Sequence, residues 1–247
     1  MASASLAVLR TEARLFTREP GILFWIVVFP TALTVILGSI PSFREVDDSL
    51  GGRRVIDLYV AVAVLLALIV AGLQAMPPIL TGYRERGILR RMSTTPVRPS
   101  ALLTAQLFVL GASAFCSAVL VIAVGRIFFE VELPRQLGGY LLALILATAS
   151  ALAFGAVVCA VAPTLKAAQA IGSVVFFPAM FTAGVWTPVQ VMPHLLREIV
   201  ECTPFGAASD ALDQAMRGVW PGWSHLGVMA LWTVLLTAGA ARWFRWE

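Results

Sequence analysis

The chain has 247 residues, of which 59% are hydrophobic and 13% are charged. Soluble domains carry about 45–50% apolar and about 25% charged residues, so this composition excludes an ordinary soluble domain. The formal net charge of +4 comes from residues that flank long apolar runs, and no basic soluble region is present that could bind nucleic acid. We therefore expect a membrane protein with no nucleic-acid partner.

The first 20 residues are patterned as an amphipathic helix. An apolar stripe and a basic stripe recur at helical spacing; they are Leu6, Leu9, Ala13 and Phe16, and Arg10, Arg14 and Arg18. Such a helix lies in the headgroup layer of a membrane, and Pro20 and Gly21 end it. The same charges interrupt any apolar core of a cleavable signal peptide, so we expect insertion through the spans themselves.

Six apolar segments are long enough to cross a bilayer, which requires about 20 residues per helix. These segments are 21–40, 58–80, 101–125, 138–162, 169–192 and 225–244. The fifth contains Pro178, Gly184 and Pro188, which favour a break before the far side. The predicted fold class is an all-α membrane protein with six transmembrane helices, forming a single domain over residues 1–247.

The basic residues predict the orientation of the spans. With the N-terminus inside, eleven of the 18 Lys and Arg residues lie in the inner segments, which are shorter than the outer loops. We expect a multi-pass protein of the plasma membrane (a cell inner membrane), with both termini cytoplasmic.

The spans contain no Asp, Glu or Lys away from their ends. Ion-coupled carriers place ionisable groups at depth, so the energy for transport is expected to come from elsewhere. Gln74 and Gln106 are expected to bond neighbouring helices. Small residues recur at every fourth position of the fourth span and predict a close helix contact, within one chain or between two copies. They are Ala143, Ala147, Ala151, Gly155 and Cys159.

The fifth span holds the candidate path for an apolar substrate. Its members are adaptable aromatic and sulfur side chains, with lipid-facing or packing roles as the alternative. They are Phe176, Phe177, Met180 and Phe181. We identify no catalytic residues and no metal ligands: the three cysteines are widely spaced, and His194 and His225 are expected to be solvated.

The most concentrated polar segment is 83–96. Four arginines flank Glu85, and three apolar residues, Ile88, Leu89 and Met92, lie between them. A short helix here would offer an apolar ridge with charged edges, which suits a groove on a partner protein.

This segment resembles the cytosolic loop of ABC-2-type permeases, the membrane subunits of a class of ABC exporters. The resemblance rests on Glu85-Arg86-Gly87-x-Leu89-Arg90-Arg91 followed by Thr95-Pro96, and it extends to 181–188, Met192-Pro193 and Thr203-Pro204-Phe205. Thr203 departs from the family, since many members carry Asn there. The resemblance implies an extracellular re-entrant segment between spans five and six, and it is nearest to the drug- and antibiotic-export branch.

The resemblance further implies a cytoplasmic coupling helix that contacts a separate ATPase subunit. Its residues would be Arg84, Glu85, Arg86, Gly87, Ile88, Leu89, Arg90, Arg91 and Met92. ATP and Mg²⁺ would bind that partner, and no cofactor is expected in this chain. Its one lysine, Lys166, lies between Leu165 and Ala167 and forms no P-loop, so the chain is not expected to be an enzyme.

The implied assembly also contains a second copy of the chain or a homologous permease, surrounded by membrane lipids. It would export an amphipathic drug-like or lipid-like compound. One alternative is a secondary carrier of hydrophobic compounds, which the lack of membrane charge and of an internal repeat disfavours. Another is an intramembrane enzyme, which the lack of convergent reactive side chains disfavours.

Overall fold

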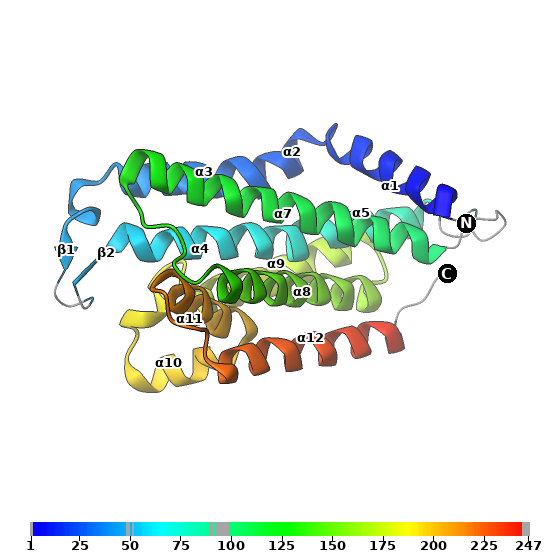
Figure 1. The fold of residues 1–247 in the computed structure, drawn as a ribbon. Helices are drawn as coiled ribbons and strands as arrows, with labels where there is room; N and C mark the ends of the chain where they lie inside the picture. Colours follow the sequence, from blue (N-terminus) through cyan, green and yellow to red (C-terminus); the bar gives the residue numbers. More distant parts are fainter. Residues whose placement is uncertain (1, 48–49, 51, 89–90, 92–98, 244–247) are drawn as a thin grey trace.

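The computed structural model describes residues 2–47, 50, 52–88, 91 and 99–243, and these form a bundle of long helices (Figure 1). Helix α1 (Ala2–Phe16) and the last turn of α12 (Trp223–Trp243) lie at one end, which we call the terminal end. A short antiparallel pair, β1 (Val46–Asp47) and β2 (Arg53–Arg54), marks the opposite end, which we call the hairpin end. The other elements run between these ends.

The elements follow the predicted order of spans. The first half of the chain contains α2 (Pro20–Leu23), η1 (Phe24–Val28), α3 (Phe29–Gly38), η2 (Pro41–Phe43), α4 (Val55–Ile69), η4 (Val70–Ala75) and α5 (Met76–Glu85). The second half contains α7 (Pro99–Phe129), α8 (Leu137–Val161), α9 (Leu165–Thr182), η5 (Val189–Val191), α10 (His194–Glu201) and α11 (Pro204–Met216), followed by α12.

Six described helices are long and apolar enough to cross a membrane, which confirms the predicted number. They are Pro20–Gly38, Val55–Glu85, Ala101–Phe129, Leu137–Val161, Leu165–Thr182 and Trp223–Trp243. The first two pass through a π-helical stretch, η1 or η4, directly before a proline-containing turn. A proline removes a backbone donor, and a local π turn re-registers the hydrogen bonds so that the helix continues.

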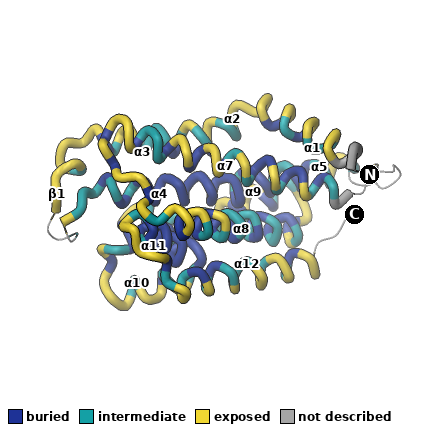
Figure 2. Tube along the Cα trace, viewed as in Figure 1, coloured by how far each residue is buried: buried dark blue, intermediate teal, exposed yellow. Residues whose placement is uncertain are grey.

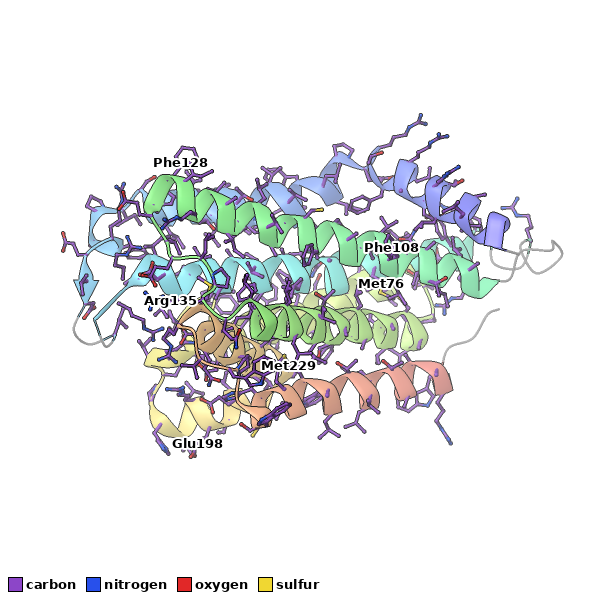
Figure 3. All side chains as sticks on the ribbon, viewed as in Figure 1. Met76, Phe108, Phe128, Arg135, Glu198 and Met229 are labelled. Atoms are coloured by element: carbon purple, nitrogen blue, oxygen red, sulfur yellow. The ribbon has the colours of Figure 1, made fainter. Side chains whose placement is uncertain are left out.

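The second span forms the centre of the bundle. Of its most apolar window, 83% is buried, whereas the first, fifth and sixth spans bury only 17–22% of theirs. Figure 2 shows α4 as a continuous dark stretch surrounded by lighter helices. Apolar side chains such as Phe108 and Phe128 on α7 point outward, while Met76 and Met229 lie inside the bundle (Figure 3). Apolar residues on the outside are what a lipid environment requires.

The small-residue ladder of α8 packs against this central span within one chain. Ala143, Ala147, Ala151 and Cys159 are all buried. A Cβ added at Gly72 would overlap the carbonyl oxygen of Ala151, and one added at Gly155 would overlap the carbonyl oxygen of Gly72. Only glycine lets two helix backbones approach this closely, so the ladder makes the intrachain contact that was one of its two interpretations.

The fifth span ends before the limit of its apolar segment, which agrees with the break expected from its proline and glycine residues. It begins at Leu165, where the Thr164 hydroxyl accepts a hydrogen bond of 3.1 Å from the N–H of Ala167, and it ends at Thr182 rather than at residue 192. The N–H groups of Gly184 and Val185 bond back to the carbonyls of Phe181 and Met180, and Gly184 has φ +86°. This is a Schellman termination, which requires the left-handed conformation that glycine adopts most easily.

Two short helices, α10 and α11, fill the segment between spans five and six at the hairpin end (Figure 1). The side chain of Thr203 caps α11, because its Oγ1 accepts a hydrogen bond of 3.2 Å from the N–H of Gly206. Threonine therefore performs here the capping role that asparagine can also perform. The departure of Thr203 from the family pattern leaves the local structure intact.

Candidate functional site

Three consecutive side chains at the end of α5 connect it to three other helices at the terminal end. Tyr83 bonds to Glu12 of α1, Arg84 bonds to the last turn of α8, and Glu85 bonds to the first turn of α9. The α5 helix ends here because Gly87 adopts φ +66°, with its N–H bonded to the carbonyl of Arg84 at 2.9 Å.

Arg84 and Glu85 hold the turn between α8 and α9 from both sides. The Arg84 guanidinium donates to the carbonyls of Cys159, at 3.2 Å, and Ala162, which end α8. The Glu85 carboxylate accepts a hydrogen bond of 2.7 Å from the N–H of Leu165, which begins α9. A cation at a helix C-terminus and an anion at a helix N-terminus both complement the helix dipole. The two charges therefore stabilise opposite ends of adjacent helices.

Tyr83 belongs to a buried polar group that sequence analysis missed. Its hydroxyl donates to Oε2 of Glu12 at 2.9 Å, and Nε2 of Gln106 on α7 donates to the same oxygen. Glu12 is only 6% exposed, and burial raises its pKa although both hydrogen bonds act to lower it. Gln106 thus bonds a neighbouring helix, as predicted. Glu12 lies on the same stripe as Leu9 and Phe16, and this spacing could have revealed its burial.

The rest of the predicted coupling segment is described in part. Arg86 is exposed, Gly87 and Ile88 are half-buried, and the Arg91 side chain is exposed. The Arg91 N–H bonds to the carbonyl of Gly87 at 3.0 Å, which gives one helical turn after α5. Leu89, Arg90 and Met92 lie outside the described residues. The expected contact of this segment with an ATPase stays a prediction.

The four residues of the predicted substrate path separate into two places. Phe176 and Phe177 line a largely apolar cavity of about 410 Å³ together with Trp25 of η1. Met180, like Phe176, packs against the core, and the ring of Phe181 lies 6.4 Å from that of Trp186. A substrate path along these four residues stays a prediction.

A second polar cluster lies at the hairpin end, around Arg197 of α10. Its guanidinium pairs with Glu201 at 2.6 Å and with Asp210 of α11 at 3.2 Å. His225 of α12 stands 3.8 Å from Glu201, and its side chain is only 14% exposed, so the prediction of a solvated His225 is wrong. Helices α10 and α11 lie over the start of α12 and shield His225 from solvent. His194 remains exposed, as predicted.

The pKa values of the two carboxyl groups in this cluster are shifted in opposite directions. Burial and the hydrogen bond to Glu201 raise the pKa of Asp210 to about 6. Burial also acts on Glu201, but hydrogen bonds from Asp210 and Arg197 prevail and lower its pKa. The ligand atoms of Glu201, Asp210 and His225 lie within 4.8 Å of one another, a spacing that could hold a cation. The Arg197 guanidinium pairs with both acids and supplies a positive charge there, and the expectation of no metal site stays a prediction.

Comparison with known proteins agrees with the geometry. The family model described as ABC-2 type transporter matches residues 4–216, from the start of α1 to the end of α11. No curated protein matches the chain by sequence. The match covers five of the six apolar helices, the segment 84–92 and both short helices of the hairpin end. The chain therefore belongs to the ABC-2 type transporter family, as a multi-pass membrane permease.

Proposed function

We propose that the chain is the membrane-spanning subunit of an ATP-driven exporter, that a separate ATPase subunit drives it, and that its cargo is amphipathic. In this proposal the terminal end is cytoplasmic, and the ATPase binds the segment 84–92. A second copy of the chain or a homologous permease completes the assembly.

The observation that supports the coupling best is the set of contacts made by Tyr83, Arg84 and Glu85. Arg84 and Glu85 begin the proposed docking segment and Tyr83 precedes it. The three bond to α1, α8 and α9, and Glu12, the partner of Tyr83, in turn bonds to Gln106 of α7. Any displacement of this segment would therefore pull on several spans at once. These bonds form a contiguous network through which displacement of one loop could change the packing of several helices.

The nature of the cargo is inferred from the spans. The cavity beside Phe176 and Phe177 is largely apolar, and the second span beside it holds ionisable groups only near its ends. A strongly charged cargo would lose its hydration there without compensation. An amphipathic compound would keep its polar part near the interface.

Gentle purification from the native membrane tests the partnership. We expect a P-loop ATPase to co-purify with the wild-type chain, and we expect Ile88→Asp to abolish this association. Ile199→Asp is the matched control, since Ile199 is exposed at the hairpin end and its replacement should leave the association intact. Retention of the ATPase by Ile88→Asp, or uphill transport by the chain without any ATPase, would contradict the proposal.

A further inference from the structure

Two cavities adjoin at the terminal half of the bundle. One has a volume of about 340 Å³ and a mixed lining; we call it the polar cavity after the polar side chains that border it, Glu12, Glu19, Tyr83, Arg86 and Gln106. The other is the apolar cavity of about 410 Å³ beside Trp25. Ile22 borders both, so the two cavities lie on either side of a single side chain. Together they offer a polar compartment next to an apolar one, the division that an amphiphile has.

The Glu12 carboxylate is the group in the polar cavity that lacks compensation. Both of its hydrogen bonds, from Tyr83 and Gln106, go to Oε2 and come from neutral donors. Among the described residues, none donates a hydrogen bond to Oε1 and none forms an ion pair with Glu12. A carboxylate that is only 6% exposed costs free energy unless a cation or further donors reach it. The free oxygen lies at a cavity that could admit one.

The charges around Glu12 select the sign of the ligand. Glu19 adds a second carboxylate to the wall of the polar cavity, and Arg86 adds one cation. The acids outnumber the cation, so an anionic headgroup would meet net repulsion. An ammonium group carries three donors and no acceptor, and it would supply both the charge and the hydrogen bond that Oε1 lacks.

The apolar cavity selects the rest of the ligand. Trp25, Phe176 and Phe177 present aromatic surface to it. Its polar side chains are the Gln74 amide and the Ser173 hydroxyl. Aromatic walls favour an alkyl or aryl group, because they bury a large area at low entropic cost. A molecule that fills both cavities therefore has a cationic head and an apolar tail.

We propose that Glu12 binds the ammonium headgroup of a single-chain cationic amphiphile whose apolar chain lies beside Trp25, Phe176 and Phe177. This inference rests on the proposed export of amphipathic compounds and specifies their class. Tyr83 and Gln106 act as positioning residues, since they fix the orientation of the Glu12 carboxylate through Oε2.

Binding to the purified chain in phosphatidylcholine nanodiscs tests the proposal, with radiolabelled dodecylamine as the probe and empty nanodiscs as background. Unlabelled dodecylamine should displace the probe at least tenfold more effectively than dodecanol, and dodecanoate should not displace it. This headgroup series uses the unaltered chain, so it needs no variant to fold. Equal displacement by the amine and the alcohol would overturn the proposal.

Variants then locate the two ends of the ligand. Glu12→Gln should weaken dodecylamine binding at least tenfold and leave dodecanol binding unchanged, whereas Glu198→Gln, at an exposed residue of the hairpin end outside both cavities, should change both little. Trp25→Ala should weaken both ligands. Unchanged amine binding by Glu12→Gln would overturn the assignment, and so would displacement of dodecylamine by phosphatidylethanolamine, which would give the cavity to a membrane lipid. No ATPase or nucleotide is present, so a negative result leaves the proposed coupling untouched.

Discussion

The carboxylate of Glu85 accepts a hydrogen bond of 2.7 Å from the backbone N–H of Leu165, across 80 positions of sequence. This bond fixes the end of the second span to the start of the fifth. Because the neighbouring Arg84 bonds to the end of α8, the turn between the fourth and fifth spans is held by two adjacent side chains.

Loss of the Glu85 carboxylate should separate ATP hydrolysis from transport. An absent helix cap costs about 1 kcal/mol, or roughly a fivefold change in a rate that depends on it. We expect Glu85→Ala to lower ATP-driven transport by about that factor while hydrolysis persists, and Glu85→Gln, which keeps an acceptor, to lose less. Transport and hydrolysis would be compared in proteoliposomes, with the exposed Glu45→Ala at the hairpin end as control. Wild-type transport by Glu85→Ala would contradict a coupling role.

Gly72→Ala should destabilise the bundle strongly. Its new methyl group would overlap the carbonyl oxygen of Ala151, a backbone atom that cannot rotate away. Overpacking of this kind costs about 1–3 kcal/mol. Gly82→Ala is the matched control, because it lies in the same span and a Cβ there meets no atom within 4 Å. Thermal unfolding in detergent should show a lower midpoint for Gly72→Ala only; equal midpoints would disprove the close approach.

Acidification from pH 7 to pH 5 should stabilise the hairpin end through Asp210. Its folded pKa of about 6 exceeds the ordinary 3.8, so the folded state binds the proton more tightly. This contribution is complete below the unfolded pKa and is lost as pH rises through about 6, a change of about 1 kcal/mol over this interval. Glu201 opposes it only at lower pH, since its own pKa is lowered from 4.5.

Asp210→Asn should remove this gain in stability, which thermal unfolding at several pH values would measure. Glu198→Gln on α10 is the control, because the Glu198 side chain is 62% exposed and would have little effect. An Asp210→Asn variant that keeps the wild-type dependence on pH would show that another group is responsible.

The proposed orientation predicts the reactivity of two thiols. Cys202 is exposed at the end of α10, so a membrane-impermeant thiol reagent should label it in intact cells. Arg86→Cys at the terminal end should be labelled only after the membrane is opened. Both would be measured in a Cys116→Ala background, since Cys116 is also exposed, although on an apolar helix. The reverse labelling pattern would place the terminal end outside.

The number of spans could be predicted from sequence because each apolar run by itself has the roughly 20 residues that a membrane helix requires. The ends of the runs were harder to predict, as the fifth shows. Its apolar residues continue past Thr182, but the left-handed Gly184 stops the helix. Hydropathy measures the preference of a side chain for an apolar medium and carries no information on backbone conformation.

The contacts of the candidate site could not be predicted from the sequence. Glu85 could be assigned to a polar loop, but its partner Leu165 becomes visible only when α8 and α9 are placed beside α5. Glu12 lies between Arg10 and Arg14 in sequence, and these charged neighbours hide its position on the apolar stripe. A carboxylate on an apolar stripe signals a buried acid that needs donors, and Tyr83 and Gln106 supply them.

The contact of Gly72 with α8 has a mechanical consequence. Gly72 lies near the middle of the central span, and its backbone touches that of Gly155, so the two helices cannot slide closer there. A relative movement of the two spans that preserves this contact is therefore a rotation about it, since their separation there is already fixed by backbone atoms.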